Sequence, residues 1–206
     1  MPTASDLSSV SPSLVVWQAY DFAVKADLFS TAVVTPGGVY VVDPIPIEQR
    51  LLSELLHLGH VQGLILTNEN HWRAAREFSG RFSAPIMAAA GAVPVGCDMD
   101  VRELQNGVEI DSALLVTAIE GAARGEIAIF HDADGGTLIV GDALINFEPY
   151  GFSVLPARYC TNQREMRRSL RRLMDFKIER ILFAHGAPIT TKAGARLRQL
   201  LDADAD

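Results

Sequence analysis

The sequence has few cysteines, no excess of positive charge and no long apolar segment, and each absence excludes a class of function. The two cysteines, Cys97 and Cys160, are too few for a disulfide framework, so we expect free thiols in a reducing cytosol. A net charge of −7 argues against broad binding to nucleic acid or to an anionic membrane. Residues 1–16 lack the basic start and the apolar run of a signal peptide or a membrane span. We therefore predict a cytoplasmic protein that binds neither nucleic acid nor membrane.

The composition is that of a folded globular protein without repeats or low-complexity linkers. Hydrophobic residues make up 49% and charged residues 21% of the 206 positions, and this length fits a single domain. We predict one domain over residues 1–206, built from two similar αβ halves at about residues 14–100 and 101–201. A homo-oligomer is compatible with these features.

Apolar runs and helical periodicities alternate along both halves. The turns Pro36-Gly37-Gly38 and Asp134-Gly135-Gly136 predict two β-hairpins. Leucines at helical spacing predict a helix within residues 47–60, and the basic segment 164–180 has the pattern of an amphipathic helix. Two sheets packed together, with helices outside, would bury the apolar faces of all these elements.

Four short segments, in this order, resemble parts of the metallo-β-lactamase superfamily. They are "YVVDP" (40–44), "ILTNENHWRAAREF" (65–78), "GEIAIFHDADGGTLIVGDAL" (125–144) and "RILFAHGAPI" (180–189). The resemblance runs from about residue 14 to residue 201 and implies a four-layer αββα sandwich of the α/β (α+β) class. It also implies a site between the two halves, where two metal ions would activate a water molecule for hydrolysis.

The second segment departs from the family at the metal ligands themselves. The family has Thr-His-x-His-x-Asp-His where this chain has residues 67–73. With Thr67 aligned, Asn68 and Asn70 take the first two His positions, Trp72 takes the Asp position and Arg73 takes the last His position. Asparagine carbonyls are poor replacements for imidazole around zinc.

The second half of the chain keeps only part of its ligand set. By the same resemblance Ala122 falls where another His is expected, whereas Asp142 and His185 remain, with Asp43 behind them as an outer support. Two protein ligands are too few for a tight zinc site, which ordinarily has at least three. We therefore predict that the dinuclear site is largely lost, and we favour no cofactor.

Arg73 is the replacement that is hardest to reconcile with a metal ion. A guanidinium stays charged and cannot coordinate a metal, so it would repel a dication. We predict that Arg73 substitutes electrostatically for the lost metal and pairs with Asp142, because a buried carboxylate without a cation is costly. Trp72 would then fill volume that the metal site has vacated.

His71 leaves two interpretations open. The alignment places it at a position that is not a ligand in the family, which favours a structural or solvent-facing role. A shift of the turn by one residue would bring it inward, where His71, Asp142 and His185 would be candidate catalytic residues or ligands of one Zn, Mn or Fe ion. Glu120 and Glu126 are weaker candidates for a general base, because the sequence gives them no partner.

The sequence thus supports three functions. The first is a non-catalytic, metal-free member of the superfamily that binds a small anionic metabolite with Arg73 and, in addition, Arg124. The second is a hydrolase of esters or thioesters with a remodelled single-metal site. The third is an interaction protein. The predicted ligand pocket consists of Asn68, Asn70, His71, Arg73, Asp142 and His185.

Overall fold

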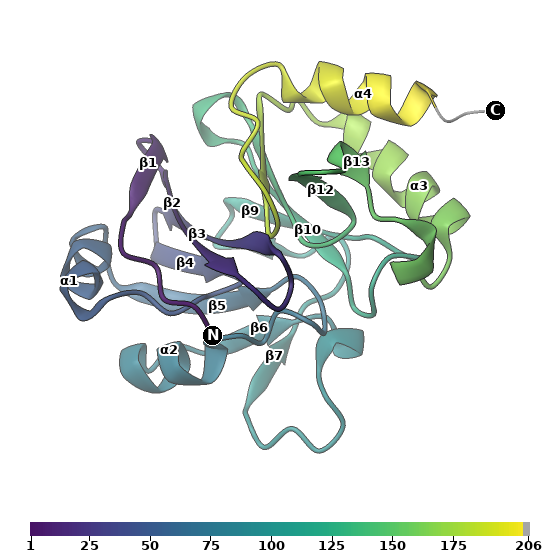
Figure 1. Ribbon diagram of the computed structural model, residues 1–206. Coiled ribbons are helices and arrows are strands. Elements are labelled where there is room, and N and C mark those ends of the chain that lie inside the picture. The colour runs from purple at the N-terminus through teal and green to yellow at the C-terminus, as the bar shows by residue number, and fades with distance from the viewer. Residues whose placement is uncertain (204–206) are drawn as a thin grey trace.

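The computed structural model describes residues 1–203 and consists of two packed β-sheets with helices on both outer sides (Figure 1). The last three residues of the predicted domain 1–206 lie outside the described residues. The first sheet has seven strands. In spatial order they are β1 (Ser8–Ser11), β2 (Leu14–Asp21), β3 (Ala26–Thr35), β4 (Gly38–Val42), β5 (Val61–Leu66), β6 (Ile86–Ala88) and β7 (Val101–Glu103). Strands β1 to β4 pair antiparallel, and β4 to β7 pair parallel.

The second sheet has five strands, and a separate two-stranded hairpin lies beside it. In spatial order the five strands are β14 (Arg180–Phe183), β11 (Thr137–Val140), β10 (Ile127–His131), β9 (Leu114–Ala118) and β8 (Glu109–Ile110). Strands β11 and β14 pair parallel. The hairpin consists of β12 (Leu144–Phe147) and β13 (Gly151–Val154).

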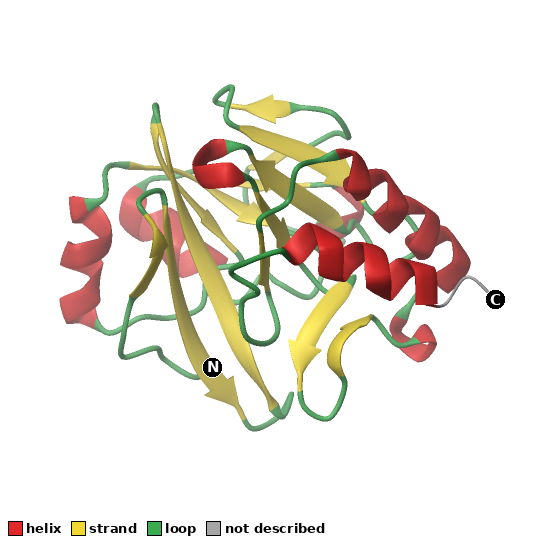
Figure 2. Cartoon of the chain, turned by 90° about the horizontal axis from the view of Figure 1, so that it is seen from above, coloured by secondary structure: helices red, strands yellow, loops and turns green. Residues whose placement is uncertain are grey.

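Two helices cover the outer side of each sheet. Helices α1 (Gln49–His57) and α2 (Ala75–Phe82) lie on the first sheet, and α3 (Gln163–Arg172) and α4 (Ala193–Ala203) on the second (Figure 2). Short 3-10 segments are η1 (Ala90–Ala92), η2 (Ala133–Gly135), η3 (Ala157–Tyr159) and η4 (Leu173–Asp175). Within residues 1–203, no helix is both long and apolar enough to span a membrane.

Three apolar clusters fill the spaces between these four layers. One joins α1 and α2 to the first sheet, one lies between the sheets, and one joins the second sheet to α3 and α4. Along β4, Val39 and Val41 face the helices, whereas Tyr40 and Val42 face the other sheet. Because successive side chains of a strand point to opposite faces, a strand buried on both sides is apolar throughout. This explains the run "VYVV".

The predicted α/β class and the four-layer αββα architecture are confirmed, with local differences. Both predicted hairpins form, β3 with β4 and β10 with β11. The first sheet extends over residues 8–103. In the basic segment 164–180 the helix ends at Arg172, and a 3-10 turn follows it. Phe176 lies beyond this turn, and its ring stacks on the ring of Phe130 with 4.6 Å between the centroids.

Two carboxylates of the second half hold turns of the first half. Asp111 accepts hydrogen bonds from the Thr35 hydroxyl and from the backbone N–H of Gly37 (2.8 Å). Asp134, in the turn between β10 and β11, accepts one from the Ser11 hydroxyl (2.7 Å). These contacts link the two sheets at turns away from the strand ends that carry the site.

The core of the first half predicts a stability effect at Trp17. Its ring is 1% exposed and stacks on Phe78 with 6.4 Å between centroids, and its indole N–H donates to the carbonyl of Ile45 (3.1 Å). We expect Trp17→Ala to lower the free energy of unfolding by about 3–5 kcal/mol, because it leaves a large cavity. Phe22→Ala is the control, since Phe22 is 86% exposed, and should change little. Equal urea midpoints for the two variants would contradict this packing.

Candidate active site

The candidate site lies where four strands of the two sheets end. Asp43 follows β4, the segment 67–73 follows β5, Asp142 comes two residues after β11, and His185 comes two residues after β14. Both pairs of strands, β4 with β5 and β11 with β14, are parallel. The carboxyl ends of parallel strands meet at one edge of a sheet, which is where open α/β folds bind ligands.

Asp142 lies at the centre of the cluster. Its Oδ1 atom is 3.3 Å from Nε2 of His71 and 3.4 Å from Nε2 of His185. The donor atoms of these three residues all lie within 4.8 Å of one another. The structure therefore brings together the three residues that the sequence nominated as catalytic or metal-ligating candidates.

The other oxygen of Asp142 faces two side-chain amides. Nδ2 of Asn68 and Nδ2 of Asn70 donate to Oδ2 of Asp142 at 3.1 and 3.2 Å. The backbone N–H of Asn70 donates to Oδ1 of Asn68 (2.8 Å), and this contact fixes which end of the Asn68 amide faces the carboxylate. Both asparagines thus present donors to Asp142, not the acceptor oxygens that a metal would require.

His71 points inward and is almost completely buried, at 1% exposed. A solvent-facing role for His71 is therefore wrong. Its Nδ1 atom lies 2.9 Å from Oδ2 of Asp43 and 2.8 Å from the Thr67 hydroxyl. Burial disfavours a charged imidazole, but the carboxylates of Asp43 and Asp142 raise the pKa of His71 to about 9. His71 is therefore a cation at neutral pH.

Arg73 also points inward, but it does not pair with Asp142, so that prediction is wrong. Its Nη1 donates to the carbonyls of Phe29 (2.9 Å) and Asp43 (3.3 Å). Its Nη2 donates to the carbonyl of Ala184 (3.4 Å) and lies 3.3 Å from Nε2 of His185. Arg73 has φ = 31°, an uncommon value for a non-glycine residue. Alignment gives the position of a residue but not the direction of its side chain.

The charges of the cluster balance. Burial lowers the pKa of His185 to about 3, so its imidazole is neutral. Burial opposes ionisation of Asp43 and Asp142, but the charge of His71 lowers both of their pKa values below the ordinary range. Two carboxylates, Asp43 and Asp142, are thus matched by two cations, His71 and Arg73.

Glu126 is a buried member of the cluster. From the sequence it was only a weak candidate for a general base. Its Oε2 accepts from Nδ2 of Asn68 (2.7 Å), and its Oε1 accepts from the backbone N–H of Ala143 (3.0 Å). Burial and the charge of Asp142 raise the pKa of Glu126 to about 8, and these two donors oppose the rise. The sequence gave no partner for Glu126 because Asn68 is 58 residues away in the chain.

Four other predicted positions lie outside the cluster. Trp72 packs against the apolar cluster beneath α1 and α2 and donates to the carbonyl of Ala92 (2.8 Å), so the prediction that it fills the metal site is wrong. Ala122 is buried in the apolar cluster beneath α3 and α4. Arg124 is exposed and lies 3.9 Å from Glu69. Glu120 is exposed.

A cavity of about 610 Å³ opens above the cluster. Its polar floor includes Asn70, His71, Arg73, Asp142 and His185, whereas Asn68 is buried beneath it. Its other walls are largely apolar or aromatic and include Val24, Leu28, Ile145, Phe147, Tyr150, Leu155, Pro156 and Tyr159. The hairpin β12–β13 supplies much of this wall. The sequence missed that hairpin, although the turn Pro149-Tyr150-Gly151 between two apolar segments was a signal for it.

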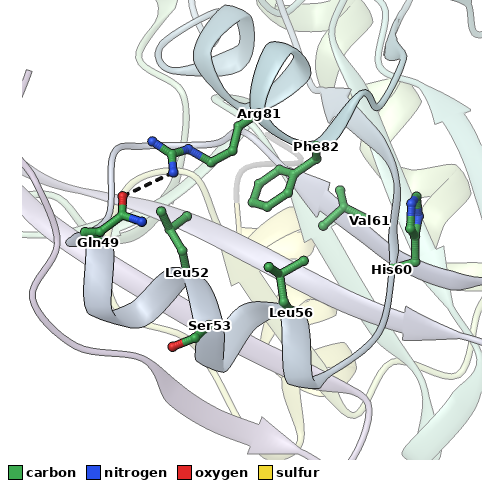
Figure 3. Close-up of a pocket in the computed structure, with 8 residues that line it drawn as sticks. All are labelled: Gln49, Leu52, Ser53, Leu56, His60, Val61, Arg81 and Phe82. Carbon is green, nitrogen blue, oxygen red and sulfur yellow. Dashed lines mark hydrogen bonds between the residues drawn. The ribbon is translucent and has the colours of Figure 1, made fainter.

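A second cavity of about 380 Å³ lies between α1 and α2, near the start of β5 (Figure 3). Leucine and phenylalanine side chains form its floor, and Arg81 donates to Oε1 of Gln49 (3.1 Å) at one end. None of the predicted site residues lines it. Since Thr67 follows the opposite end of β5, this cavity is separate from the cluster.

Comparison with known proteins identifies the family. A sequence profile described as the metallo-β-lactamase superfamily matches residues 7–203. The chain belongs to this superfamily. No curated protein sequence matches the chain. Among solved structures, the DIM-1 metallo-β-lactamase superposes with a TM-score of 0.75 at 13% identity over 99% of each chain.

Other solved structures of the same fold are similar. A metallo-β-lactamase family protein of Thermus thermophilus, TTHA1429, has a TM-score of 0.68 and 19% identity, covering 95% of this chain and 79% of that one. TTHA1623, solved in a di-iron-bound form, has a TM-score of 0.65 and 18% identity, covering 87% of this chain and 97% of that one. At such low identity these superfamily structures establish the fold alone.

The donor set does not fit the two metal ions that the superfamily implies, but it has enough atoms for one. Asn68, Asn70 and Arg73 present N–H donors. Nε2 of His71, by contrast, is buried and has no hydrogen-bond partner among the described residues. Its contact with Oδ1 of Asp142 at 3.3 Å is an ion pair without hydrogen-bond geometry. With Asp142 and His185 it makes a metal-capable cluster of three residues, the usual number of protein ligands at a catalytic zinc.

The charge of His71 predicts a loss of stability at alkaline pH. The folded state keeps the proton up to about pH 9, whereas the unfolded imidazole loses it near its ordinary pKa of 6.5. The stabilisation is therefore complete below pH 6.5 and is lost as the pH rises through 9. Glu126, with its pKa raised from 4.5 to about 8, acts in the same direction over an overlapping range, so Glu126→Gln isolates the effect of His71.

The measurement is urea unfolding of Glu126→Gln between pH 6.5 and 9, with the double variant Glu126→Gln/His71→Asn as the control. We expect the free energy of unfolding to fall with pH in the single variant and to change less in the double variant. Parallel profiles would contradict a protonated His71.

Proposed function

We propose that this superfamily member binds a small organic ligand above the cluster and functions without a dinuclear metal centre. The observation that carries the proposal is the environment of Asp142. Both oxygens of this buried carboxylate face nitrogen atoms, from His71 and His185 on one side and from two asparagine amides on the other. A carboxylate surrounded in this way does not need metal ions to compensate for its burial.

Arg73 supports the same proposal. Nε2 of His185 lies 3.3 Å from Nη2 of Arg73, so a cation already lies against the atom that a metal would need. Together with protonated His71, Arg73 balances the charges of Asp43 and Asp142. A dication added to this cluster would be repelled by both groups.

An anionic group on the ligand remains part of the proposal, but Arg73 is poorly placed to bind it. Four of its N–H groups are directed at three backbone carbonyls and at His185. Arg124 is directed at Glu69 and does not line the cavity. The cavity itself combines a few polar groups with apolar walls, which is the usual character of a small-molecule site. We also propose a cytoplasmic location, since both cysteines are free.

The unpartnered Nε2 atom of His71 favours a second candidate, a hydrolase of esters or thioesters with one metal ion. Asp43 behind Nδ1 would hold the His71 ring with Nε2 toward the ion, as carboxylates do behind metal-binding histidines. His71, Asp142 and His185 would be the ligands. A bound Zn²⁺, Mn²⁺ or Fe²⁺ would supply an activated water molecule. Arg73 would have to withdraw from His185, which is why this candidate is second.

Elemental analysis distinguishes the two candidates. Protein incubated with Zn²⁺, Mn²⁺ or Fe²⁺ and then desalted should hold well under one equivalent of metal, because Arg73 and the proton on His71 compete for the same atoms. Arg73→Ala should retain more Zn²⁺ than the wild type, since it frees Nε2 of His185. Asp142→Asn in the Arg73→Ala background should lose it again.

Arg76→Ala is the matched control for Arg73→Ala, because Arg76 is exposed and pairs with Asp98 at the surface. It should hold as little metal as the wild type. One equivalent of metal in the wild type, absent in His71→Ala and accompanied by chelator-sensitive thioester hydrolysis, would overturn the first candidate in favour of the second.

A further inference from the structure

A row of rings runs from the floor of the 610 Å³ cavity to its rim. The centroids of His71 and His185 are 5.4 Å apart, those of His185 and Phe147 are 6.4 Å apart, and those of Phe147 and Tyr150 are 5.6 Å apart. All four residues line the cavity. The outer two rings, those of Phe147 and Tyr150, offer an apolar surface to a ligand with a flat apolar body.

Arg158 is held beside the outer end of this row. It lies on η3, and its Nη2 donates to the hydroxyl of Tyr150 (2.8 Å). Its guanidinium carbon is 4.8 Å from the centroid of the Tyr159 ring. Tyr150 and Tyr159 line the cavity and Arg158 itself does not, so the two contacts hold the cation just outside the cavity, against two rings of its wall.

The two arginines near the cavity differ in what they can still bind. Arg73, at the floor, is directed at carbonyls and at His185, and its charge is balanced within the cluster. Arg158 is exposed, and within residues 1–203 it forms no ion pair with a carboxylate. Its remaining N–H groups have the fork geometry that matches a carboxylate. Positive charge available to a ligand therefore lies at the rim.

We propose that the ligand is a flat apolar acid, whose carboxylate binds Arg158 and whose apolar body lies along the rings of Tyr150 and Phe147 toward the floor. This inference rests on the proposed ligand-binding function and adds the chemical class of the ligand. The sequence pattern predicted that Arg73 binds the anionic group of the ligand. In this proposal Arg158 binds that group instead.

Calorimetric titration with 2-naphthoate and its uncharged analogue 2-naphthamide tests the proposal. The wild type should bind the acid about tenfold more tightly than the amide, the scale of one hydrogen-bonded charge contact. Arg158→Ala should bind the two probes equally, whereas Arg158→Lys should keep part of the preference, because lysine retains the charge without the fork. Arg50→Ala is the control, since Arg50 is exposed and pairs with Glu48 away from the cavity.

The outcomes separate this inference from the function on which it rests. Equal affinities for the two probes in the wild type, or an unchanged preference in Arg158→Ala, would overturn the role of Arg158 and leave the ligand-binding pocket in place. Failure of both probes to bind the wild type would overturn the inference as well. A stoichiometric metal that depends on His71 would instead contradict the proposed function, whatever the result at Arg158.

Discussion

The burial of the Asp142 carboxylate is the constraint on which the whole site depends. A charge removed from water must be met by a cation or by hydrogen-bond donors, or the fold loses several kcal/mol. Here Oδ1 lies between two imidazole nitrogens at 3.3 and 3.4 Å, and Oδ2 between two amide nitrogens at 3.1 and 3.2 Å. The segment after β5 therefore supplies donors to Asp142, and the carboxylate is not left uncompensated. Asn68 and Asn70, at two positions where the family resemblance predicts histidine ligands, contact the same carboxylate.

Arg73 also connects the two halves of the fold at the site. Arg73 comes from the first half and donates to the carbonyls of Phe29 and Asp43 there, but it also reaches Ala184 and His185 in the second half. In a dinuclear site, ions shared between ligands of both halves would make this connection. In this chain a guanidinium and a protonated imidazole make it.

The sequence predicted the layers well, because each layer follows from a local pattern of apolar and turn residues. The site depends on the directions in which side chains point, and the sequence pattern does not contain these. The run at β4 is apolar because both faces of that strand are buried, and glycine-rich turns mark both predicted hairpins. The Arg73–Asp142 pair was wrong because a positive φ at Arg73 accompanies a side chain that reaches across to Ala184. The inward turn of His71 and the contact of Glu126 with Asn68 across 58 residues likewise have no signature in the chain.

The most direct test of the account is the protonation state of His71 in solution. Long-range ¹H–¹⁵N correlation spectra distinguish a doubly protonated imidazole from either neutral tautomer and from a metal-bound ring. The account predicts that at pH 7 His71 carries protons on both ring nitrogens, that His185 is neutral, and that one equivalent of Zn²⁺ shifts neither signal. A neutral His71 whose Nε2 signal moves stoichiometrically with added Zn²⁺ would contradict it.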